Sequence, residues 1–196
     1  KEIGELTNLT NLGLSYNQLT DLPKEIGELI NLKELNLCSN KLFNLPQEIE
    51  KLNNLTSLNL VDNQILELPK EIGQLSNLTN LYLKENLLAE LPKEIGELTN
   101  LRILDLEKNQ LTELPKEIGK LTNLTHLVLS SNQLTGLPKE IGQLDNLIKL
   151  EIYDNFIFSL PIELKGFISN ENFRSDLTID KYFDYKLITE LDFTGR

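Results

Sequence analysis

Leucines and isoleucines recur along this chain of 196 residues with a fixed period of 23. One period runs from Leu101 to Asn123 and reads LRILDLEKNQLTELPKEIGKLTN. The pattern LxxLxLxxNxLxxLPxxIxxLxN occurs in seven consecutive copies, of which the first is incomplete. A period of this length that runs through a whole chain predicts a solenoid with one coil per copy.

Each copy predicts a short strand followed by a turn of helix. Leu104 and Leu106 alternate with polar neighbours, which indicates a strand with one buried face. Pro115 has no N–H group and suits the first position of a helical turn. Ile118 and Leu121 follow three residues apart, so a short 3₁₀ or α turn would bury both. Stacked coils place the parallel strands on one side and the turns on the other, and the unequal widths curve the solenoid with the sheet on its concave side.

The central asparagine of each copy predicts a structural ladder. An Asn amide carries both donors and acceptors, so it can pair backbone groups that a turn withdraws from water. Aligned copies would repeat these bonds from coil to coil. The ladder residues are Asn17, Asn40, Asn63, Asn86, Asn109, Asn132 and Asn155.

The consensus LPxxIGxLxxLxxLxLxxNxL, seen from Leu91 to Leu111, resembles the leucine-rich repeat of the 23-residue type over about residues 3 to 161. The resemblance implies an α/β fold, a right-handed horseshoe solenoid. The repeats are similar to those of intracellular Ras-group and Scribble-type proteins, and closer still to leucine-rich repeat proteins of pathogenic spirochaetes. The former resemblance implies scaffolding or GTPase-pathway contacts, and the latter implies a bacterial protein that binds a host component or acts at the cell surface.

Two regions are expected: a seven-copy solenoid over residues 1–161 and a C-terminal cap over 162–196. Later copies carry Leu-Pro directly before KEIG or its equivalent, whereas the first copy begins at KEIG without this Leu-Pro. We therefore expect residues before Lys1 in the natural protein. Residues 162–196 hold half of the aromatic side chains, and Leu177–Thr178–Ile179 suggests a degenerate eighth strand. A cap suits the atypical terminal repeats of solenoids, while the start of a second, partner-facing domain is the alternative.

Charge and cysteine content narrow the classes of partner. The net charge of −11, with a pI near 4.6 and no basic run, disfavours nucleic acid, because binding phosphates needs clustered Lys and Arg. No apolar stretch approaches the roughly 18 residues of a membrane span. The single cysteine, Cys38, excludes an internal disulfide and fits an incidental free thiol. The lack of Cys-rich caps points to a cytoplasmic or bacterial protein, surface-exposed or secreted in the latter case; the compartment stays open.

The outward strand positions vary between copies, whereas the inward ones barely vary. We therefore expect the concave face to determine the binding partner. Copies four to seven concentrate aromatic and aliphatic side chains among charges, as a protein-binding hot spot requires. The alternative is that these residues are simply good strand formers. The candidate partner-binding residues are Tyr82, Lys84, Ile103, Asp105, Glu107, His126, Val128 and Tyr153.

The same face offers little for catalysis. His126, Asp105 and Glu107 suggest a metal site only weakly, because no second histidine exists and an open sheet provides no pocket. We predict no enzyme, no metal and no cofactor, and a protein partner bound by a non-catalytic interaction module. One alternative is a regulatory arm of a larger GTPase or kinase. Another alternative is an assembly protein whose coils stack end to end through uncapped termini. The expected oligomeric state is a monomer or weak self-association through an uncapped end.

Overall fold

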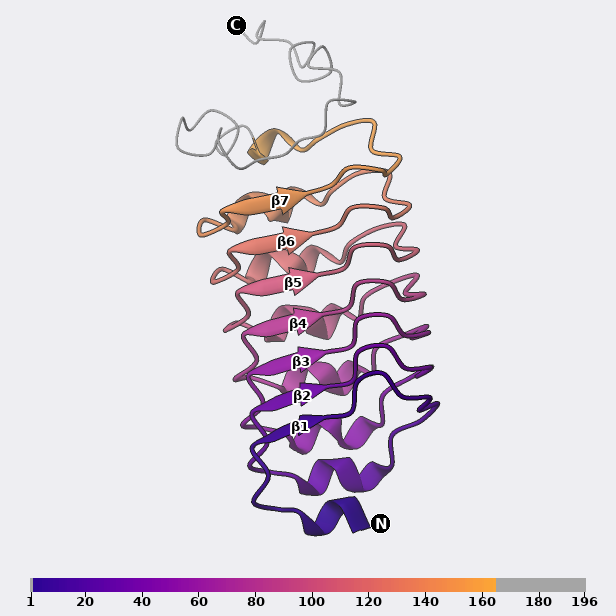
Figure 1. Ribbon diagram of the computed structural model, residues 1–196. Helices are drawn as coiled ribbons and strands as arrows, with labels where there is room; N and C mark the ends of the chain where they lie inside the picture. Colours follow the sequence, from indigo (N-terminus) through magenta and orange to yellow (C-terminus); the bar gives the residue numbers. More distant parts are fainter. Residues whose placement is uncertain (1, 165–196) are drawn as a thin grey trace, which may run out of the picture.

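The computed structural model describes residues 2–164, which form a stack of coils (Figure 1). The strands are β1 (Asn11–Gly13), β2 (Glu34–Asn36), β3 (Ser57–Asn59), β4 (Asn80–Tyr82), β5 (Ile103–Asp105), β6 (His126–Val128) and β7 (Lys149–Glu151). The 3₁₀ helices are η1 (Glu2–Glu5), η2 (Lys24–Glu28), η3 (Gln47–Lys51), η4 (Lys70–Gln74), η5 (Lys93–Glu97), η6 (Lys116–Lys120), η7 (Lys139–Gln143) and η8 (Ile162–Leu164).

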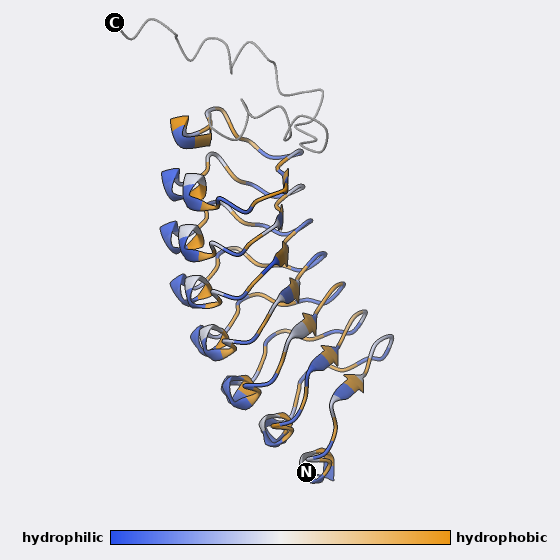
Figure 2. Ribbon diagram, turned by 90° about the vertical axis from the view of Figure 1, so that its left-hand side faces the viewer, coloured by the Kyte–Doolittle hydropathy of each residue, from blue (hydrophilic) through white to orange (hydrophobic). Residues whose placement is uncertain are grey.

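The seven strands form one parallel sheet in chain order, β1 to β7. Every residue of β1 to β6 is aligned with the residue 23 positions later, as Leu81 is with Leu104 and Leu104 with Leu127. The sheet lies on the inner side of the curved stack and the 3₁₀ helices on the outer side (Figure 2). The predicted solenoid, with its sheet on the concave face, is confirmed.

Proline begins each complete helical turn. Pro115 has an extended backbone with φ −64° and ψ 142°, and its carbonyl accepts the first bond of the turn from the Ile118 amide at 3.0 Å. The Leu121 amide then donates to the Ile118 carbonyl at 3.1 Å and closes the turn. The ring of proline suits this position because its missing N–H would have no partner inside the turn. All the described turns are 3₁₀, which decides between the two forms that the sequence allowed.

The core is one continuous strip between the sheet and the turns. Leu104, Leu106, Ile118 and Leu121 have no exposed surface, and their equivalents in the other central copies are buried as well. Each copy contributes the same inward positions, so the strip is built from repeated leucine and isoleucine contacts between neighbouring coils.

The last described element, η8, stacks on η7. Leu164 takes the position of Ile141 in the preceding turn and is 3% exposed. Residues 162–164 therefore continue the stack by one turn. The rest of the expected cap, including the suggested strand at 177–179, lies outside the described residues, and the cap stays a prediction.

Candidate partner-binding face

From Asn40 onward, the side chain of each ladder asparagine joins its coil to the one before it. The Asn109 Nδ2 donates to the Leu83 carbonyl of the preceding coil at 2.9 Å and to the Leu106 carbonyl of its own coil at 3.1 Å. Its Oδ1 accepts from the Leu88 amide at 3.1 Å. The residue before it, Lys108, has a φ of 55°, and this sharp turn repeats in every copy. The bonds hold successive coils in one register, so outward side chains line up in rows across the sheet.

A second asparagine ladder runs along the other end of the strands. Each of its side chains donates to a backbone carbonyl 24 residues earlier, at 2.7 to 2.9 Å. No role was predicted for these residues from the sequence, although they recur with the same period of 23. The residues are Asn31, Asn54, Asn77, Asn100, Asn123 and Asn146.

Three rows of side chains cross the concave face between β4 and β7. In the middle row Asp105 lies between its register partners Tyr82 and Val128. A second row, at the start of the strands, places Ile103 beside His126. The third row follows the strand ends and holds Lys84, Glu107, Ser130 and Tyr153. Backbone hydrogen bonds join the coils along this row, for example from the Lys108 amide to the Ser130 carbonyl. The sequence-predicted residues thus share one surface.

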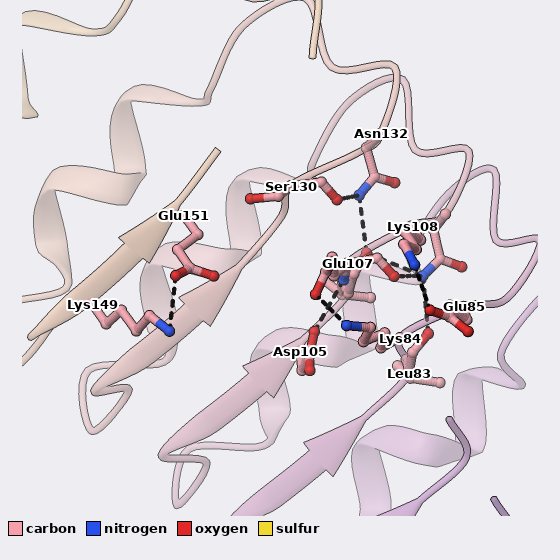
Figure 3. A network of polar contacts seen from close by, with 12 residues as sticks. Leu83, Lys84, Glu85, Asp105, Glu107, Lys108, Ser130, Asn132, Lys149 and Glu151 are labelled. Atoms are coloured by element: carbon pink, nitrogen blue, oxygen red, sulfur yellow. Dashed lines mark hydrogen bonds and ion pairs between the residues drawn. The ribbon is translucent and has the colours of Figure 1, made fainter. Parts of the chain in front are cut away.

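Two ion pairs lie on this surface (Figure 3). The Lys84 Nζ lies 2.7 Å from the Glu107 Oε2, and the Lys149 Nζ lies 2.8 Å from the Glu151 Oε1. The hydrogen bond to Glu107 raises the pKa of Lys84, and the bond to Glu151 raises that of Lys149. Both glutamates are only 16% exposed at the side chain, so these pairs are less screened than ordinary surface pairs. Lys149 and Glu151 were not among the predicted site residues.

Asp105 is the half-buried carboxylate between these pairs. Burial raises the pKa of its carboxyl above the ordinary value, and the Glu107 carboxylate acts in the same direction. The backbone amide of Glu107 donates to the Asp105 Oδ1 at 3.1 Å, which opposes the shift, as does the charge of Lys84. The carboxylate is therefore kept at the centre of the face against a desolvation penalty.

The β6 positions are the most enclosed part of the face. Val128 is only 9% exposed, and Ser130 has no exposed surface. The Ser130 Oγ is buried and has no hydrogen-bond partner among residues 2–164. Val128 therefore offers a partner little area, whereas Tyr82, Ile103 and Tyr153 are half-buried and accessible.

His126 stands apart from the carboxylates. Its Nδ1 lies 3.0 Å from the Thr125 Oγ1, and its register partners are Ile103 and Lys149. Within residues 2–164 no group of three His, Cys, Asp or Glu side chains is placed to hold a metal ion. The structure does not unite His126, Asp105 and Glu107 as metal ligands. Over the same residues, no helix has the length and apolar character needed to cross a membrane.

Two family models match the chain, one for leucine rich repeats over residues 7–65 and one for a leucine-rich repeat region over residues 81–165. A comparison with curated proteins gave no match. Together the two models cover most of the solenoid. The chain is a leucine-rich repeat protein, as the 23-residue consensus predicted.

Solved structures agree with this assignment. A leucine-rich repeat protein of Leptospira interrogans is 45% identical, with a TM-score of 0.64, over 84% of this chain and 48% of that protein. The ectodomain of the Arabidopsis thaliana receptor kinase GASSHO1/SCHENGEN3, in complex with CASPARIAN STRIP INTEGRITY FACTOR 2, is 37% identical, with a TM-score of 0.77, over 83% of this chain and 20% of that chain. An internalin from Listeria monocytogenes is 29% identical, with a TM-score of 0.71, over 79% of this chain and 44% of that chain. The chain thus spans about half of the Leptospira protein and a fifth of the plant ectodomain, and it is similar to a spirochaete member of the class.

Proposed function

We propose that this protein is a non-catalytic interaction module that binds a protein partner on the concave face of β4–β7. The observation that carries the proposal is the arrangement of Tyr82, Ile103 and Tyr153 on one accessible face, with two ion pairs and Asp105 among them. Half-buried aromatic and aliphatic anchors surrounded by charges are the usual composition of a binding hot spot.

The relatives support a protein ligand. The GASSHO1/SCHENGEN3 ectodomain is solved with CASPARIAN STRIP INTEGRITY FACTOR 2, and the plant peptide hormone receptor RGFR1 is solved with RGF2. We further propose a bacterial protein that engages a host component, which the similarity to the Leptospira protein favours.

Replacing one tyrosine on the face tests the site. The immobilised chain first captures partners from bacterial and host lysates, and the affinity of a captured partner is then measured by calorimetry. We expect Tyr82→Ala to weaken binding at least tenfold, which is about 1.4 kcal/mol, because it removes an aromatic anchor from the β4 strand of the face.

Tyr16→Ala is the matched control. It deletes the same ring from a position that is 82% exposed in the loop after β1, away from β4–β7. Its affinity should equal that of the wild type, and circular dichroism should show that both variants keep the fold. Equal affinities for all three chains would exclude the concave face of β4–β7 as the binding site.

One observation favours a second function, a regulatory arm of a larger signalling enzyme. The plant relative is a receptor kinase, and the match covers only a fifth of its ectodomain. A kinase or GTPase signature in sequence contiguous with this chain would support that reading.

A further inference from the structure

The hydrogen bond that Asp105 makes to the backbone does not require a negative charge. Its Oδ1 accepts a hydrogen bond from the backbone amide two residues later, at 3.1 Å. Asn36 and Asn59, at the same position of earlier copies, accept the equivalent bonds at 3.1 and 3.0 Å. A neutral asparagine therefore satisfies this turn as well as an aspartate does, so the turn does not account for the negative charge.

The Asp105 carboxylate lies in the field of Lys84 and Lys149 without bonding to either of them. The two lysines near it are already bonded, Lys84 to Glu107 and Lys149 to Glu151. Within residues 2–164, no basic nitrogen forms an ion pair with the Asp105 carboxylate. The three carboxylates outnumber the two lysines here, and the whole chain carries a net charge of −11. The electrostatic complement of this face is a cation.

A polar group without a hydrogen-bond partner among residues 2–164 lies in the row of side chains that follows the strand ends. The Ser130 Oγ is buried, and no group in the described part of the chain forms a hydrogen bond with it. Figure 3 shows Ser130 between the Lys84–Glu107 and Lys149–Glu151 pairs. Ser130 is one strand across and two residues along from Asp105, which places the two Cα atoms about 8 Å apart in an ordinary parallel sheet. Buried polar groups are nearly always bonded, so this hydroxyl and the Asp105 carboxylate together suit a ligand with several donors.

We propose that the concave face binds an arginine side chain of the protein partner, with the guanidinium paired to the Asp105 carboxylate and donating to the Ser130 hydroxyl. This inference rests on the proposed function and specifies its ligand. A guanidinium is planar, always charged and rich in N–H donors, so one group serves two separated acceptors.

Neighbouring side chains fit the rest of an arginine. Tyr82 and Val128 are the register partners of Asp105 and lie on either side of it. Val128 is nearly covered, but the half-buried Tyr82 offers a surface on which the methylenes of an arginine can pack, and its ring attracts a cation that lies over its face. Ser130 is covered in the free chain, and its row neighbours Glu107 and Tyr153 are half-buried side chains that can change rotamer on binding.

The test uses peptides selected from a random 12-residue phage library on the whole chain. Each selected peptide is synthesised with arginine and with citrulline, its uncharged analogue, and its affinity is measured for the wild type, for Asp105→Asn and for Tyr82→Ala. Asp105→Asn is a conservative change because asparagine keeps the turn at positions 36 and 59. We expect the citrulline peptide to bind the wild type at least tenfold more weakly. Asp105→Asn should lose a similar factor, and the two changes together should give no further loss.

Other results overturn the proposal in distinguishable ways. Peptides that lose affinity on Tyr82→Ala but not on Asp105→Asn or with citrulline would leave the concave-face site standing and exclude the arginine. Peptides insensitive to both variants would exclude the site as well. A library without binders would also count against the arginine, since it presents arginine in many contexts.

Ser130→Ala tests the second contact. We expect the affinity of the arginine peptide to fall about threefold, the usual size of one hydrogen bond. The melting temperature of the free chain should not fall, because the lost hydroxyl has no partner within residues 2–164. An unchanged affinity would remove Ser130 from the site.

Discussion

At the scale of single residues, the asparagine of each copy does more than end a turn. The Asn109 side chain bonds two carbonyls and one amide and is 8% exposed. Asn17, in the first copy, is exposed and bonds only the Leu14 and Ser15 carbonyls of its own coil. The same residue type therefore contributes differently according to whether a preceding coil offers it partners.

Asparagine-to-alanine substitutions should show this difference. We expect Asn109→Ala to lower the free energy of unfolding by about 1–3 kcal/mol, because it leaves buried backbone groups without partners. Asn17→Ala should have a smaller effect, since water reaches the groups that it exposes. Urea denaturation measures both, and equal losses would mean that the bonds between coils add nothing.

At the scale of elements, glycine sets how closely the 3₁₀ helices stack. A Cβ added to Gly96 in η5 would lie 2.5 Å from the Glu117 carbonyl oxygen and 2.8 Å from the Glu117 Cβ in η6. Backbone atoms cannot move aside as a flexible side chain would. The third copy carries Glu50 at this position, so the step from η3 to η4 already accepts a side chain. Gly96 is therefore the sharper place to test the packing of neighbouring turns.

Gly96→Ala should lower the free energy of unfolding by about 1–3 kcal/mol through overpacking against η6. Gly136→Ala is the control, since no atom lies within 4 Å of its added Cβ. We expect it to be neutral or slightly stabilising, because alanine reduces the freedom of the unfolded chain. Thermal unfolding of the two variants compares them, and a harmless Gly96→Ala would show that the turns can separate freely.

At the scale of the whole molecule, stability is built from contacts between neighbouring coils. Leu104 and Leu106 are fully buried between the coils on either side, whereas Leu12 and Leu14 of the first coil are only partly buried. In a solenoid each coil adds its own stability and that of its interfaces, so opening the first coil breaks one interface and opening a central coil breaks two.

Hydrogen exchange should follow that order. The Leu14 amide donates to the Asn36 carbonyl at 2.7 Å, and the Leu106 amide donates to the Val128 carbonyl at 2.8 Å. The two bonds are equivalent, yet we expect the Leu106 amide of this chain to exchange more slowly, because its coil opens less readily. Exchange followed by NMR measures both rates. Equal protection would indicate that the stack opens as a single unit.

The sequence by itself determined the coil. The local signals are leucines at alternate positions, the proline three residues before Ile118 and the asparagine two residues before Leu111. Each requires one backbone conformation wherever it recurs. Their repetition at 23 residues then leaves a parallel stack as the way to bury every leucine, so the fold and the eight residues that share the concave face could be predicted.

Only the tertiary structure decided how those residues meet. Whether Lys84 pairs with Glu107, or whether Val128 is reachable, depends on side chains 23 residues away and on the curvature that the whole stack produces. Ser130 is a further example. It occupies the same position in its copy as Lys84 does, yet Lys84 is accessible, whereas Ser130 is buried and has no partner within residues 2–164. A local pattern fixes where a side chain points, whereas its neighbours in adjacent coils fix what it touches and how much water it keeps.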